Sequence, residues 1–120
     1  MSKTCYTYKE AQTILGPYDD TIDFMGPKGA EQYVPRHIVG ICMNTAAYEH
    51  DLAYIMGGGE EEKIDADIAF MAMMMYEVET HKFWWGTNWL LKSIARKQVM
   101  WYYTAVVAGG ARSFCYIQES

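Results

Sequence analysis

The segment "AAYEHDLAYIMGGGEEEKIDADIAF", residues 46–70, carries the clearest structural signal in the chain. Its two halves have helical character, and the three glycines at 57–59 that separate them suit the C-terminal end of a helix. The glutamates at 60–62 then fall in the first turn of the next helix, where the helix dipole favours negative charge. Two long helices joined by so short a turn are predicted to lie antiparallel.

Outward from this stretch, the sequence predicts a small domain built of helices. Residues 16–38 contain all three prolines and are predicted to form a long ordered loop. Thr87-Asn88 suit the N-terminal cap of a last helix, and Gly109-Gly110 suit its end. Alternating β patterns are nearly absent, so the predicted class is all-α, with a single domain over residues 1–120. The predicted helices are residues 7–15, 40–56, 61–80 and 89–108.

Composition narrows the classes of partner. Apolar residues make up 51% of the 120 residues, which is enough for a packed core. The formal net charge of −5 argues against a nucleic-acid binder that follows phosphates. It also gives no general attraction to anionic membranes, so a lipid contact would depend on apolar and aromatic surface. Trp84, Trp85 and Trp89 are predicted to lie partly in the core and partly in such a patch.

The cysteines and the apolar runs indicate the cellular compartment in which the protein is expected. Cys5, Cys42 and Cys115 are odd in number and widely spaced, which is no disulfide framework and no metal-binding pair. The fold is therefore predicted to stand without crosslinks, as suits a reducing compartment. Residues 1–16 lack the continuous apolar stretch of a secretory signal, and no run reaches the roughly 18–20 residues that span a bilayer. We expect a soluble domain that is cytoplasmic where it is made.

A histidine and an aspartate interrupt the first long helix. His50, Asp51 and Tyr54 share one helical face with Ala47, so a base, an anionic oxygen and a hydroxyl lie together. If the two long helices are antiparallel, Asp67 can accept a hydrogen bond from His50. A carboxylate behind an imidazole fixes its tautomer and stabilises the imidazolium that forms when it takes a proton. The pattern predicts the base of a hydrolytic site with its orienting group.

The segment "DFMGPKGA", residues 23–30, lies upstream of these helices. Its glycines allow backbone conformations that turn carbonyl groups toward one point. Calcium takes about six to eight oxygen ligands, including carbonyls and carboxylates. These carbonyls, together with Asp51, predict a calcium site at which the ion acts as a Lewis acid on an ester carbonyl.

Three segments in order, "FMGPKG", "AAYEHDLAY" and "ADIAF", resemble the phospholipase A2 superfamily. Its secreted members read Cys-Cys-x-x-His-Asp-x-Cys-Tyr in the active-site helix, and alanines 46, 47 and 53 stand at the cysteine positions here. The nearest pattern is that of the disulfide-free domains in parvovirus capsid proteins. These have a Tyr-x-Gly-Pro-Gly-Asn loop before Ala-Ala-x-x-His-Asp-x-x-Tyr and Ala-Asp-x-x-Phe. The resemblance covers about residues 23–76.

The resemblance implies calcium-dependent hydrolysis of the sn-2 ester of glycerophospholipids by a peripheral enzyme at a membrane interface. It also implies a viral or phage setting, with a protein that can be associated with the virion. His50 would be the general base, Asp67 would orient it, and Tyr54 would support Asp67. The implied calcium ligands are the Asp51 carboxylate and the backbone carbonyls of Phe24, Gly26 and Lys28.

Two departures from the family pattern lie in the loop, and three other interpretations stay open. Phe24 replaces the usual tyrosine, and Lys28 stands where glycine is usual, so the loop could shift by one residue to Gly29 or bind calcium less tightly.

One alternative is a catalytically weak or inactive membrane- or partner-binding module of the same fold. Another is a phosphohydrolase of the HD-domain type, although no aspartate follows Asp67. The third is a plain helical bundle with a buried His50–Asp51 pair.

Overall fold

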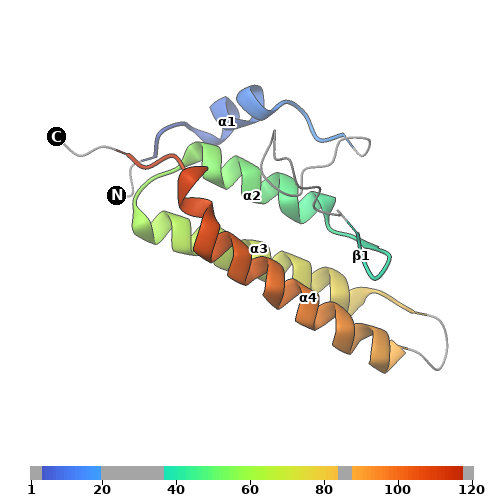
Figure 1. Cartoon of the computed structure of the whole chain (residues 1–120). Helices are drawn as coiled ribbons and strands as arrows, with labels where there is room; N and C mark the ends of the chain where they lie inside the picture. The colour runs from blue at the N-terminus through green and yellow to red at the C-terminus, as the bar shows by residue number, and fades with distance from the viewer. Residues whose placement is uncertain (1–3, 20–36, 84–87, 118–120) are drawn as a thin grey trace.

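The computed structural model describes residues 4–19, 37–83 and 88–117, and this part of the chain is mostly helical (Figure 1). The predicted all-α class is therefore confirmed. Helices α2, α3 and α4 pack side by side, and α1 lies on α2. A two-stranded hairpin precedes α2. The elements are α1 (Tyr8–Leu15), β1 (His37–Ile38), β2 (Ile41–Cys42), α2 (Asn44–Met56), α3 (Glu60–Thr80), α4 (Asn88–Gly109) and the 3₁₀ turn η1 (Gly110–Arg112).

Helix α1 confirms the predicted short helix, and its ends follow from local chemistry. The Thr7 hydroxyl accepts a hydrogen bond from the Glu10 backbone N–H at 3.2 Å, and the Glu10 carboxylate accepts one from the Thr7 N–H at 3.0 Å. This reciprocal pair satisfies two backbone donors at the helix start. The helix ends at Gly16, whose φ of +91° no longer fits a helix.

Helix α2 begins later than predicted, so the prediction of a helix from residue 40 is wrong at its start. The backbone pairs Ile38 with Ile41 in an antiparallel hairpin instead. Val39 and Gly40 form its turn with φ values of +51° and +83°, as two-residue hairpin turns of the primed type require. Ile38 and Ile41 are buried, so the hairpin contributes to the core beside α2.

The glycine turn between α2 and α3 forms as predicted. Gly57 has φ of +69° and donates its N–H to the carbonyl of Ala53 at 2.9 Å. A Cβ added at Gly57 would collide with the backbone of Cys115, because the C-terminal segment passes directly over this turn. Gly58 donates to the carbonyl of Cys115 at 2.9 Å and accepts from the N–H of Ile117 at 2.9 Å. The turn therefore connects two helices and also anchors the end of the described chain.

A disulfide joins Cys5 to Cys115, so the prediction of a fold without crosslinks is wrong. The spacing of these cysteines hides their proximity, because 110 positions separate them and only the folded chain brings both ends to the α2–α3 turn. Cys5 donates its N–H to the carbonyl of Met56 at 2.6 Å, and Cys115 donates to that of Tyr54 at 3.1 Å. Cys42 is exposed and has a free thiol.

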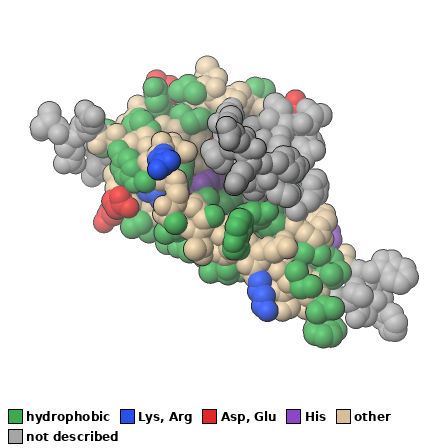
Figure 2. All heavy atoms as spheres, viewed as in Figure 1, with side chains coloured by type: hydrophobic (Ala, Val, Ile, Leu, Met, Phe, Trp, Pro, Cys, Tyr) green, Lys and Arg blue, Asp and Glu red, His purple; other side chains and the backbone are tan. Residues whose placement is uncertain are grey.

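Helix α4 packs along α3 with a narrow buried face, in which Ala95 and Val99 are fully buried. Its other faces carry large apolar side chains: Trp89 is 73% exposed and Trp101 is 67% exposed. Figure 2 shows hydrophobic side chains at the surface of the face that carries α4. Of the three tryptophans predicted to divide between core and surface, Trp89 lies at the surface. Trp84 and Trp85 lie outside the described residues. None of the helices in the described ranges is both long and apolar enough to cross a membrane.

Candidate functional site

His50 and Asp67 meet between α2 and α3, as the spacing predicts. The His50 Nε2 atom lies 3.0 Å from the Oδ1 atom of Asp67. His50 is 8% exposed and Asp67 is 1% exposed, so this contact is almost completely removed from water. The His50 ring stacks on Phe70 of α3, with ring centroids 4.4 Å apart and planes inclined by 23°. The imidazole is therefore held both by a hydrogen bond at one edge and by an aromatic face.

Tyr54 completes the predicted trio one helical turn after His50. Its hydroxyl donates to the same Oδ1 atom of Asp67 at 2.6 Å. The rings of Tyr54 and His50 lie with centroids 4.2 Å apart. One carboxylate oxygen of Asp67 thus accepts from two neighbouring residues of α2, and this fixes α2 against α3.

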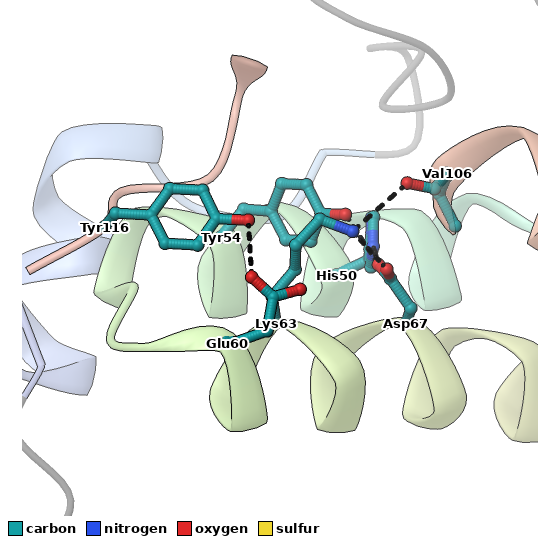
Figure 3. A network of polar contacts seen from close by, with 7 residues as sticks. All are labelled: His50, Tyr54, Glu60, Lys63, Asp67, Val106 and Tyr116. Carbon is teal, nitrogen blue, oxygen red and sulfur yellow. Dashed lines mark hydrogen bonds and ion pairs between the residues drawn. The ribbon is translucent and has the colours of Figure 1, made fainter. Parts of the chain in front are cut away.

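Lys63 is a member of the cluster that the sequence reasoning missed. Its Nζ atom donates to the Asp67 Oδ2 atom at 2.8 Å and to the backbone carbonyl of Val106, on α4, at 3.4 Å (Figure 3). Lys63 is only 4% exposed, although it follows three glutamates in the sequence. Its spacing was the available signal, because a lysine four residues before Asp67 shares the inward face of α3 with Phe70.

The electrostatics of the cluster follow from burial and hydrogen bonding. Burial by itself would raise the pKa of Asp67, but hydrogen bonds from His50, Lys63 and Tyr54 outweigh it and lower that pKa. Burial lowers the pKa of His50, and the neighbouring Asp67 carboxylate offsets only part of this effect. Burial and the contact with Asp67 raise the pKa of Tyr54. Near neutral pH, therefore, an ionised carboxylate faces a neutral imidazole and a protonated phenol.

These protonation states fix which ring nitrogen of His50 is basic. An ionised carboxylate accepts hydrogen bonds and cannot donate them, so the nitrogen that faces Asp67 carries the proton. Nε2 of His50 is that nitrogen. The lone pair then lies on Nδ1, which is the atom able to take a proton from water or from a bound molecule.

The C-terminal segment supports Tyr54 from outside the cluster. Phe114 packs edge-on against the Tyr54 ring, with centroids 5.2 Å apart and planes at 88°. Tyr116 continues this aromatic row and donates from its hydroxyl to the Glu60 carboxylate at 3.3 Å (Figure 3). Because Cys115 lies between these two aromatic residues, the disulfide holds the segment beside the site.

Gly110 gives a direct test of this support. A Cβ at Gly110 would collide with the Tyr54 hydroxyl, whereas nothing lies within 4 Å of a Cβ at Gly109. We expect Gly110→Ala to lower the free energy of unfolding by about 1–3 kcal/mol, the usual cost of overpacking a filled site. Gly109→Ala is the matched control and should stay within about 0.5 kcal/mol of the parent. Urea denaturation measures both, and equal effects at the two positions would contradict the close packing on Tyr54.

The lowered pKa of Asp67 predicts how this residue contributes to stability as the pH changes. A carboxylate whose pKa falls on folding stabilises the fold above its unfolded pKa of about 3.9, and this contribution is lost as the pH falls through the folded pKa. Asp67→Asn leaves Lys63 buried without its ionic partner, and we expect a loss of about 3–5 kcal/mol at pH 6. Urea denaturation across an acid series should show this gap closing below about pH 4. A gap that stayed constant down to the acid limit would show that Asp67 is not ionised in the fold.

Asp51 is half-buried and follows His50 directly on α2. A carboxylate is a hard oxygen donor of the kind that calcium prefers, so Asp51 fits the role that the sequence predicts for it. Phe24, Gly26 and Lys28, the other predicted ligands, lie outside the described residues, as does Gly29. Within residues 4–19, 37–83 and 88–117, no group of three or more His, Cys, Asp or Glu side chains could hold a metal ion.

No family model, curated protein or solved structure matches the chain. The arrangement of His50, Tyr54, Lys63 and Asp67 is therefore the basis for a functional assignment. In it, the buried partner of His50 is Asp67 on a neighbouring helix. An imidazole with one nitrogen held by a carboxylate is equipped for proton transfer at the other nitrogen.

Proposed function

We propose that this protein is a phospholipase A2-type enzyme, which hydrolyses the sn-2 ester of glycerophospholipids with the help of calcium at a lipid surface. The observation that carries the proposal is the buried hydrogen bond between His50 Nε2 and Asp67 Oδ1, 3.0 Å long, which leaves Nδ1 as the basic atom. The order of the three sequence segments that resemble the phospholipase A2 superfamily supports the same assignment. In this proposal α2 and α3 are the two antiparallel helices that carry the active site.

In the proposed reaction, His50 acts on water directly. Nδ1 takes a proton as the water oxygen bonds to the ester carbonyl carbon, and Asp67 stabilises the imidazolium that forms. The ester C–O bond then breaks, and His50 returns the proton to the departing glycerol oxygen. The products are a free fatty acid and a lysophospholipid, and His50 is neutral again. Tyr54 keeps Asp67 in place throughout, because its raised pKa leaves the phenol protonated as a donor.

Calcium would be held by the Asp51 carboxylate and by the carbonyls of Phe24, Gly26 and Lys28, and when bound it would stabilise negative charge on the ester oxygen. Of these proposed calcium ligands, Asp51 is the one within the described residues, and it directly follows His50 in the sequence. Consecutive positions on α2 keep the anionic ligand and the base at the same level of this helix.

The test uses phosphatidylcholine vesicles in which the sn-1 and sn-2 positions carry different fatty acids. The purified protein is incubated with calcium or with a chelator, and mass spectrometry identifies the fatty acid released. We expect release of the sn-2 acid with calcium and no release with the chelator. Release of the sn-1 acid, release of a phosphorylated head group, or equal rates in both conditions would each contradict the proposal.

The alternative is a catalytically weak or inactive module that binds a membrane or a partner. The exposed Trp89 and Trp101 on α4 favour it, because large aromatic side chains suit a lipid–water boundary. The same vesicle experiment separates the two functions when sedimentation is measured beside hydrolysis. Binding to vesicles without release of any fatty acid would support the module and contradict the enzyme.

A further inference from the structure

Lys63 is a buried cation on α3, and its depth requires an explanation. Lysine is rarely buried to this extent, because removing an ammonium group from water costs several kcal/mol unless it is paired. The ion pair with Asp67, 2.8 Å long, supplies that compensation between residues one helical turn apart. The carbonyl of Val106 gives Nζ a second acceptor, and this acceptor belongs to α4. Lys63 therefore connects the carboxylate of Asp67 to the third long helix.

The two oxygen atoms of Asp67 have different partners. Oδ1 accepts from His50 and Tyr54 of α2, whereas Oδ2 accepts from Lys63. The terminal torsion of an aspartate is broad, so a carboxylate held on one side only can rotate. The bond from Lys63 removes this freedom, because any rotation that moved Oδ1 away from His50 would also break the contact at Oδ2.

We propose that Lys63 is a positioning residue: by holding Oδ2 of Asp67 and linking it to α4, it aims Oδ1 at His50 and keeps the imidazole proton on Nε2. The catalytic consequence of this role rests on the proposed function, in which Nδ1 of His50 acts on water. The effect of Lys63 on the imidazole tautomer is independent of the proposed function, because the tautomer can be measured without any substrate.

The test compares Lys63→Met with the parent protein by ¹H–¹⁵N correlation spectroscopy of the histidine ring nitrogens. Methionine keeps an unbranched apolar side chain but has no proton to donate to Oδ2. At a pH where His50 is neutral, we expect the parent to hold the Nε2–H tautomer and Lys63→Met to give a mixture with the Nδ1–H tautomer. A variant that keeps only the Nε2–H tautomer would overturn the proposal.

Val78→Ala is the matched control, because Val78 is fully buried on the same helix and has no place in the polar cluster. It loses packing, so it should be less stable than the parent and still hold the Nε2–H tautomer. A tautomer mixture in Val78→Ala would mean that general loosening is sufficient, and it would also overturn the proposal. If Lys63→Met does not fold in buffer, the spectra are recorded in trimethylamine N-oxide, which favours the folded state.

Kinetics separate this proposal from the proposed function. If both hold, kcat of Lys63→Met falls in proportion to the remaining Nε2–H fraction, and KM stays at the parent value. A tautomer mixture in Lys63→Met, in a protein whose parent releases no fatty acid, would support the positioning role and contradict the phospholipase. If Lys63→Met keeps only the Nε2–H tautomer and the parent releases the sn-2 fatty acid, the phospholipase is supported and the positioning role of Lys63 is contradicted.

Discussion

His50→Gln is expected to lower kcat for release of the sn-2 fatty acid by about 10²- to 10⁴-fold, the usual contribution of a positioned general base. The glutamine amide can still donate to Oδ1 of Asp67, which His50 contacts at 3.0 Å, so α2 and α3 stay connected. The amide has no basic nitrogen, and proton removal from water is lost. The measurement is fatty acid release from phosphatidylcholine with calcium, with circular dichroism as the check on folding.

His81→Gln is the control for this experiment, since His81 lies beyond the end of α3 and contacts Phe83, outside the polar cluster. It should retain the parent rate. A His50→Gln protein that folds and keeps most of its activity would remove the assignment of His50 as the base. A loss of activity together with a loss of helical content would mean that the imidazole ring, which stacks on Phe70, is needed for folding.

Loss of the Cys5–Cys115 disulfide is expected to have a large effect on stability. The crosslink closes a loop that contains nearly the whole chain, with 110 positions between the two cysteines. Loops of this length restrict the unfolded chain strongly, and the chain-entropy relation gives about 4–5 kcal/mol for them. We therefore expect the Cys5→Ser, Cys115→Ser double variant to lose about 4 kcal/mol of unfolding free energy. Urea denaturation without reductant measures this loss.

Two controls accompany the disulfide experiment. Cys42→Ser should leave stability unchanged, because Cys42 is exposed and has no crosslink. Reductant should destabilise the parent to the level of the double variant and leave the double variant itself unaffected. A double variant as stable as the parent would mean that the backbone bonds of Cys5 to Met56 and of Cys115 to Tyr54 are sufficient to hold the two ends.

Local signals predicted the helices well where they were strong. The Thr7–Glu10 capping box and Gly16 set the bounds of α1, and the glycines at 57–59 separate α2 from α3. The start of α2 was predicted too early because Val39 adopts a positive φ, which residue type gave no reason to expect. Its conformation is set by the pairing of Ile38 with Ile41, which depends on the core.

The candidate site shows the same division between local and tertiary information. His50, Tyr54 and Asp67 could be predicted because helical spacing places them on facing surfaces of two consecutive helices. The role of Lys63 was harder to predict, because its second hydrogen-bond acceptor is the carbonyl of Val106, 43 positions away in the sequence. The disulfide was missed for a related reason, because its two cysteines become neighbours only after all the helices have packed.

The cluster around Asp67 also affects how uniquely the helices align. The hydrophobic core contains several methionines, including the fully buried Met43 and Met74, with further methionines packed partly buried against it. Such unbranched side chains adapt to many packings, so a methionine-rich seam would tolerate slippage of one helix by a turn along another. Hydrogen bonds are directional and would be broken by such slippage. His50 of α2 and Lys63 of α3 both bind Asp67, and Lys63 also donates to the Val106 carbonyl of α4. These bonds form together in only one alignment of the three helices. The same polar atoms that suit the site for proton transfer thus select a single alignment of an otherwise permissive core.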